Sequence, residues 1–226
     1  MADLRKDGGI QTFTSIKTDK SVVGFRKALN RNILRYKNPE IETLISSMLQ
    51  AESISPDSLL MLFWNASYNN DLLDYLNRMV FFPALYSGRI SVRQDEVIAC
   101  MKDLKPSETV IQNWSESTLR ITSSKYLTFL KKLNLMEGSQ NKTILHPYLD
   151  DKMWILFLYW LSAVENKVNV LESKWLQYSF NERQIFIERI LQKKYLKFIH
   201  ISFSGDSLKI EPIMSYKKIY HALIQS

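Results

Sequence analysis

The chain has 226 residues, of which 46% are hydrophobic and 23% charged, and this composition suits one large or two small folded domains. Glycine and proline are scarce, at six each, so a turn-rich β-sandwich is not expected. The single cysteine, Cys100, excludes a disulfide within the chain and fits a reducing, cytoplasmic location. Its apolar surroundings predict a buried small side chain.

The net charge of +7 is unevenly distributed along the chain. Residues 1–37 carry nine Lys and Arg against three Asp and Glu, and residues 117–226 carry sixteen against nine. Residues 38–116 carry five against eleven. Clustered cations release counterions from phosphates, so the basic flanks favour a polyanionic partner. The acidic middle could instead dock on a basic surface of the same chain or of another protein.

Several helices are expected over residues 19–104, after a polar tail or loosely docked arm at 1–18. The first begins near Asp19 and stops at Asn38-Pro39, because the residue before a proline avoids the helical region. Its cations are Arg26, Lys27, Arg31, Arg35 and Lys37. Further helices are expected over 41–49, from Ser55-Pro56, from Asn70-Asp71 until the pattern fades between Pro83 and Gly88, and after a capping box at 91–94. Short joints indicate a helical bundle.

Residues 106–148 show a different pattern. Pro106-Ser107 begins a short helix that ends near Trp114, and a break at Ser115 precedes a long helix over 116–135. A turn at 137–141 and a strand candidate over 142–148 follow. This order of elements is typical of a winged helix-turn-helix, which has a short helix, a tight turn, a long helix with a polar and basic face, and then a hairpin.

The last third of the chain repeats this order loosely. The apolar run over 153–164 predicts a helix that starts near 151. A membrane-spanning helix needs about 20 apolar residues, so this shorter run is expected to be buried in the core instead. We expect a second helix over 171–178 and then a capping box at 179–182 with a basic helix after it. Two strands should follow, over 195–203 and 208–213. We therefore expect a mainly α fold with a helical bundle, helix-turn-helix and wing over 19–149 and a C-terminal winged-helix-like domain with a β-hairpin over 150–226.

No catalytic or cofactor motif is recognisable in the sequence. His146, His200 and His221 are far apart and lie near no cluster of acids or cysteine at metal-ligand spacing. The glycines fit no nucleotide-binding fingerprint, and there is no G-x-S-x-G elbow. We therefore expect a non-enzymatic protein without a cofactor, a metal or a small-molecule ligand.

Polar and basic positions on two helices are the candidate nucleic-acid contacts. If the long helix enters a major groove, Arg120 and Ser124 would approach bases, while its lysines and Lys142 of the wing would meet phosphates. A helix N-terminus also offers free N–H groups to an anion near Ser117. The candidates are Ser117, Arg120, Ser124, Lys125, Lys131, Lys132 and Lys142 in the first region, and Arg183, Arg189, Lys193, Lys194 and Lys197 in the second. Each set could equally be a solvated helix face.

The run Trp114-Ser115-Glu116-Ser117-Thr118, the basic amphipathic helix after it and the exit Leu133–Gly138 resemble the BrxA family of BREX bacteriophage-defence components. Lys193–Leu196 and Leu208–Pro212 are similar to the same family, so the resemblance runs from about residue 20 to 213. It implies a compact helical protein with helix-turn-helix-like and winged-helix-like organisation that binds double-stranded DNA without known catalysis. It also implies other BREX proteins, including a DNA methyltransferase, as partners.

Three functions are compatible with the sequence. The leading hypothesis is a DNA-binding accessory protein of phage defence, with affinity that depends on salt and only weakly on sequence. The second is a protein–protein scaffold that docks acidic partners of the same system without binding DNA. The third is RNA binding through the helical bundle.

Overall fold

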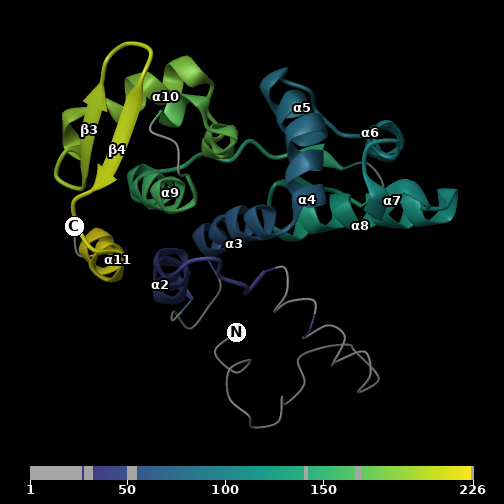
Figure 1. The fold of residues 1–226 in the computed structure, drawn as a ribbon, viewed down its shortest axis with the longest axis horizontal. Helices are drawn as coiled ribbons and strands as arrows, with labels where there is room; N and C mark the ends of the chain where they lie inside the picture. The colour runs from purple at the N-terminus through teal and green to yellow at the C-terminus, as the bar shows by residue number, and fades with distance from the viewer. Residues whose placement is uncertain (1–26, 28–32, 50–54, 140–141, 166–168, 225–226) are drawn as a thin grey trace, which may run out of the picture.

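The protein is mainly helical with two small antiparallel β-hairpins, in a computed structural model that describes residues 27, 33–49, 55–139, 142–165 and 169–224 (Figure 1). The α-helices are α2 (Pro39–Met48), α3 (Pro56–Asn69), α4 (Asp71–Leu76), α5 (Phe82–Tyr86), α6 (Gln94–Leu104), α7 (Thr109–Gln112), α8 (Glu116–Lys132), α9 (Asp151–Val164), α10 (Arg183–Ile190) and α11 (Tyr216–Ile224). The π-helix η2 (Asn77–Phe81) and the 3-10 helices η3 (Val170–Glu172), η4 (Lys174–Ser179) and η5 (Lys193–Tyr195) complete the helical part. Strands β1 (Met136–Glu137) and β2 (Thr143–Ile144) form one hairpin, and β3 (Ile199–Phe203) and β4 (Leu208–Pro212) form the other.

Local caps fix where several helices begin, as the sequence predicts. Ser55, Asn70, Ser115 and Asp150 each accept a backbone N–H three residues ahead, over 3.1, 3.0, 3.2 and 2.7 Å respectively. Each of these bonds satisfies a donor that the first helical turn leaves without a partner. The predicted helix starts at residues 56, 71, 116 and 151 are therefore confirmed.

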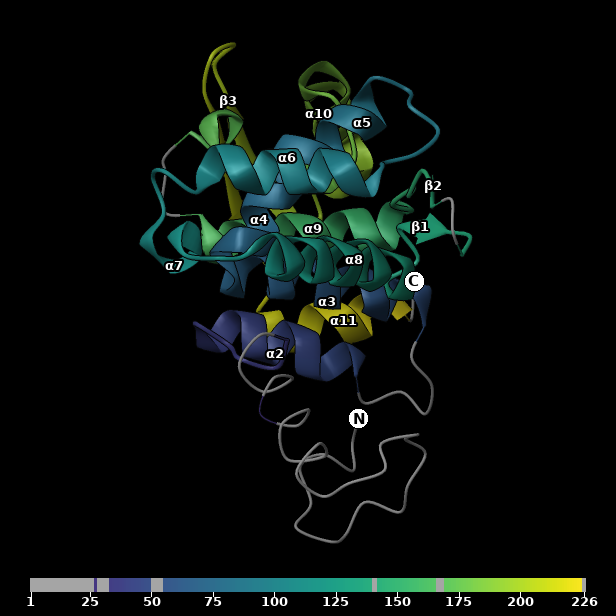
Figure 2. The same cartoon turned by 90° about the vertical axis from the view of Figure 1, so that its right-hand side faces the viewer.

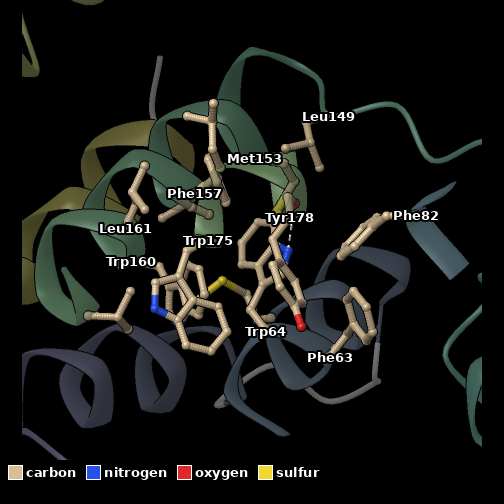
Figure 3. Packing of buried hydrophobic residues seen from close by; sticks show 14 of the residues in the cluster. Phe63, Trp64, Phe82, Leu149, Met153, Phe157, Trp160, Leu161, Trp175 and Tyr178 are labelled. Atoms are coloured by element: carbon tan, nitrogen blue, oxygen red, sulfur yellow. Dashed lines mark hydrogen bonds between the residues drawn. The ribbon is translucent and has the colours of Figure 1, made fainter. Parts of the chain in front are cut away.

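The core forms around α9, whose side chains from Met153 to Leu161 are all buried. Trp64 of α3 lies against it, with its ring centroid 5.2 Å from that of Phe157 and 5.8 Å from that of Trp160 (Figure 3). Trp64 Nε1 also donates a hydrogen bond of 3.1 Å to the carbonyl of Tyr178. The expected buried helix is confirmed, and no helix in the described ranges is long and apolar enough to cross a membrane.

One hydrophobic cluster contains side chains from α2 through to α11. The C-terminal helix α11 packs against α2 and α9, and α9 also contacts β4 and η4. Figure 1 shows the β3–β4 hairpin, α10 and α9 on the left of the view and α6, α7 and α8 on the right, with α3 between them. Side chains from both sides of residue 150 thus share the core, and the boundary expected there stays a prediction.

The first half departs from expectation in two places. Most of the helix expected over 19–37 lies outside the described residues, but its last part, 33–37, is not helical. Asn65 Nδ2 donates to the carbonyls of Ile33 and Arg35, over 2.6 and 3.1 Å, and so holds this segment in another conformation. The helix from Asp71 ends at Tyr86 after a π-helical turn, which confirms the end expected between Pro83 and Gly88.

The second departure concerns the helix cap before α6. The expected box at 91–94 does not form, because α6 begins at Gln94 and its N-cap is Arg93. The N–H of Arg93 donates to Glu96 over 3.3 Å, which is the acidic half of a capping box displaced by two residues. Ser91 instead forms a β-bridge with Thr143.

The second half also differs from the sequence prediction. The long helix ends at Lys132 rather than 135, because Asn134 adopts a left-handed conformation with φ of 57° that turns the chain into β1. The strand expected over 142–148 is only Thr143–Ile144, and the helix expected over 171–178 is two 3-10 helices. Ser179 does not cap α10, since it ends η4 and Phe180 follows it with a φ of 57°. The C-terminal helix α11 was not predicted.

Candidate nucleic-acid interface

Helices α6, α7 and α8 and the β1–β2 hairpin form one structural unit, seen from its outer side in Figure 2. Gln94, at the start of α6, joins it to α8 by donating to the carbonyl of Arg120 over 2.8 Å and to Ser123 Oγ over 3.0 Å. The hairpin pairs Met136 with Ile144, and the β-bridge from Ser91 extends it on the other side of β2. The chain before α6 and the chain after α8 therefore meet in the same small sheet.

The inward face of α8 is held by packing and by a buried hydrogen-bond network. Leu119, Leu127 and Leu130 lie in the core. Tyr126 Oη donates to Asn77 Oδ1 over 3.0 Å, and Asn77 Nδ2 donates to Tyr178 Oη over 3.3 Å. Burial raises the pKa of both phenols, so Tyr126 and Tyr178 stay protonated as donors.

The outward face of α8 carries the candidate residues that the sequence proposed there. All six are exposed: Ser117, Arg120, Ser124, Lys125, Lys131 and Lys132. Helical periodicity places Ser117 and Ser124 along the middle of this face. The same periodicity places Arg120 and Lys131 on the flank toward the start of α6 and Lys125 and Lys132 on the opposite flank.

Two contacts at the edges of this face affect its charge. Lys131 Nζ donates to the carbonyl of Gly138 over 2.6 Å, which ties this cation to the hairpin. Glu116, in the first turn, pairs with Lys102 of α6 over 2.9 Å. Because the carboxylate has a cationic partner, it opposes the approach of an anion to the start of α8 less than a free acid would.

A polar cavity of about 220 Å³ lies between the start of α6, the side of α8 and the hairpin. Its lining brings Ser124 together with Lys142, two candidates that are separated in the sequence, and adds Arg93. The Arg93 side chain is 76% exposed and lies 3.9 Å from Asp95. Sequence reasoning missed Arg93, although its place beside a helix start in a Val-Arg-Gln segment was a usable signal.

The second set of candidates is divided by the structure. Arg183, Lys193 and Lys197 are exposed. Lys194 is exposed too, but its Nζ donates to both carboxylate oxygens of Asp151, over 2.8 and 2.6 Å. This ion pair raises the pKa of Lys194 and lowers that of Asp151.

Arg189 is buried, with only 9% of its surface exposed. Its guanidinium carbon lies 4.4 Å from the ring centroid of Trp154, and it donates to the carbonyl of Leu149 and to Tyr195 Oη. Asp151 is 3.8 Å away. The interpretation of Arg189 as a DNA contact was therefore wrong, because its donors face the protein interior.

The structure does not bring the two sets together. Figure 1 shows α10 on the left of the view, above α9, and α8 on the right. Within the described residues, no group of three or more His, Cys, Asp and Glu side chains is arranged to hold a metal ion.

The BrxA family model matches residues 21–157, which is more than half of the chain. The matched range includes the W-S-E-S-T run, the whole of α8 and the β1–β2 hairpin, and it ends within α9 before the second set of cations. No curated protein and no solved structure matches the chain. The chain therefore belongs to the BrxA family, and this membership implies a component of a BREX phage-defence system.

Proposed function

We propose that this protein is a non-enzymatic, double-stranded DNA-binding subunit of its defence system, and that α6, α7, α8 and the β1–β2 hairpin act as a winged helix-turn-helix. The observation that carries the proposal is the outward face of α8, which has cations on both flanks and a middle that is polar apart from Ile121. The bridge between Ser91 and Thr143 supports it, because it joins the hairpin to the segment before α6, as we would expect of a wing.

The dimensions of this face suit a major groove. An α-helix is about 10–12 Å across with its side chains, and the major groove of B-DNA is about 12 Å wide. A helix lying in the groove turns its middle toward base edges and its flanks toward the two phosphate backbones. Arg120 would then contact one backbone, and Lys125 and Lys132 the other, while Lys131 stays bonded to the hairpin.

The cavity beside α8 adds contacts on one flank. Arg93 and Lys142 line this cavity together with Ser124, so they would extend the phosphate contacts from the groove to the wing. Ser117 and Ser124 would face bases, with the small hydroxyls able to donate or accept. We assign Arg183, Lys193 and Lys197 a weaker, auxiliary role, because they lie at the other end of the molecule.

The test is binding of the purified chain to a labelled random-sequence duplex across a salt series. We expect the logarithm of affinity to fall linearly with the logarithm of salt concentration, with a slope set by the number of phosphates contacted. The variant K125E/K132E reverses two exposed cations on one flank of α8 and should bind about tenfold or more weakly at low salt. Lys131 is left intact because it bonds to the hairpin.

The matched control is K217E/K218E, which makes the same change in net charge on two exposed positions of α11. It should bind nearly as well as the unmodified chain. If both variants lost the same DNA affinity, net charge alone would explain the effect. That result would contradict the assignment of α8 as the DNA-binding helix. A duplex RNA competitor that displaces the DNA at equal concentration would favour RNA as the partner.

A second candidate function is protein docking within the same system, including contact with a DNA methyltransferase. A cavity of about 220 Å³ is lined by Tyr86, Phe180 and Ile185, with Ile185 50% exposed. Exposed apolar side chains beside a cavity are typical of protein contacts. Absence of duplex binding even at low salt would move this function to first place.

A further inference from the structure

The middle of the outward face of α8 contains one apolar side chain, Ile121, which is 53% exposed. It is not among the described side chains that pack on the hydrophobic core. Its neighbours along the helix, three and four residues away, are Ser117, Thr118, Ser124 and Lys125. Ile121 therefore has no apolar neighbour on its own helix surface, and the flanks on either side of it are cationic.

A single exposed isoleucine is ordinary on a protein surface, so its position carries the argument. A protein-docking patch would need contiguous apolar area, which the neighbours of Ile121 do not supply. The surrounding charge favours a polyanion, and duplex DNA is the polyanion that presents a matching apolar group. In the major groove that group is the C5 methyl of thymine.

We infer that Ile121 contacts thymine C5 methyl groups in the major groove and gives the protein a preference for thymine beneath α8. The inference rests on the proposed function, since it requires α8 to lie in the groove. It assigns the cations of α8 to phosphates, which carry no sequence information, and Ile121 to a base edge, which does. Ile121 is then a specificity-determining residue rather than a main source of affinity.

The experiment uses the full chain and two otherwise identical pools of random-sequence duplex, one containing thymine and the other uracil throughout. The two pools differ only in the C5 methyl group. The unmodified chain should bind the thymine pool about fourfold more tightly, as expected for burial of one methyl group. I121A should bind both pools equally, and I121V, which keeps an apolar branched side chain, should retain most of the preference.

The matched control is V110A, which shortens an even more exposed apolar side chain, 77% exposed, on α7. V110A should keep the preference for thymine, and I121A should keep the salt dependence of the unmodified chain because no phosphate contact is lost. Equal binding of both pools by the unmodified chain would overturn the inference while leaving the proposed DNA binding intact. Retention of the preference by I121A would also overturn it. Failure to bind either pool would remove the proposed function itself.

Discussion

Two groups of cations occupy different ends of the molecule, one on α8 and one around α10 and η5. On α8, Arg120, Lys125 and Lys132 are exposed and form no ion pair within the described residues. Around α10, Arg189 is buried and Lys194 is paired with Asp151. A basic helix can bind a polyanion only with the cations that the fold itself does not use, and this condition favours α8.

The cations around α10 are used to hold the start of α9. Asp151 accepts hydrogen bonds from Lys194 and from Tyr195 Oη, the latter over 2.6 Å, while Arg189 lies between Asp151 and the ring of Trp154. These contacts join segments about forty residues apart in the chain. The second group therefore stabilises the junction of α9 with α10 and η5, and its exposed members outside these contacts are Arg183, Lys193 and Lys197.

The replacement of Arg189 by methionine should have the largest effect on stability. R189M removes hydrogen bonds to Leu149 and Tyr195 and a buried cation over Trp154, so we expect a loss of about 2–4 kcal/mol in the free energy of unfolding. Urea denaturation measures it, and the fraction that remains folded should bind duplex DNA normally.

The matched control for R189M is K193M, which removes an exposed cation four residues later and should change stability by less than about 0.5 kcal/mol. If R189M were as stable as K193M but bound DNA poorly, Arg189 would belong to the interface. That outcome would mean that the cations around α10 bind DNA as those of α8 do.

The inward side of α8 gives the next largest effect. Y126F removes the hydroxyl that donates to Asn77 and leaves a buried acceptor without this partner, so we expect a loss of about 1–2 kcal/mol in unfolding free energy. T128A removes an exposed hydroxyl from the same helix and should be nearly neutral. Equal stability of the two variants would show that the network through the π-helix does not hold α8 in place.

Features governed by neighbouring residues could be predicted from the sequence. The starts of three helices could be predicted from Ser55, Ser115 and Asp150, because an N-cap side chain bonds to a backbone N–H only three residues ahead. The outward face of α8 was predictable for a similar reason, since helical periodicity separates Leu119 and Leu130 from Arg120 and Lys131.

Features governed by distant residues could not be predicted in the same way. Arg189 looks like any surface arginine until Leu149 and Trp154 are placed beside it by folding. Helix α11 is short, and its apolar residues Ile219 and Leu223 are buried in packing that includes α2, far away in the sequence. The cavity that joins Ser124 to Lys142 likewise depends on the hairpin bringing them together.

The exposed cations of the second group provide a smaller test of the comparison. K193E/K197E makes the same charge change as K125E/K132E but at the other end of the molecule, where both side chains are exposed. We expect duplex affinity at low salt to fall by only about two- to threefold, through the weaker long-range potential. A loss as large as that of the α8 variant would make both ends part of one DNA path and abolish the distinction.

The smallest expected effect belongs to the ion pair that occupies Lys194. Asp151 accepts a hydrogen bond from Lys194 and another from Tyr195. Both bonds hold the pKa of Asp151 below its ordinary value, and the bond from Lys194 has the larger effect. The resulting stabilisation is fully present above the unfolded pKa of about 3.9 and is lost as the pH falls through the lower folded pKa. Because the Asp151 side chain is 52% exposed, solvent screening should limit this contribution to less than about 1 kcal/mol.

D151N should accordingly be slightly less stable than the unmodified chain at neutral pH, and the difference should shrink steadily as acid protonates the carboxylate. Unfolding free energies of both proteins between pH 7 and pH 2 measure this convergence. K194M should lose the same unfolding free energy at pH 7. The double variant D151N/K194M should lose less than the sum of the two single variants, since each single variant removes the same interaction. A difference between D151N and the unmodified chain that persists at pH 2 would mean that the carboxylate charge is not its cause. Lys194 would then not be held by Asp151, and it would return to the cations available for DNA.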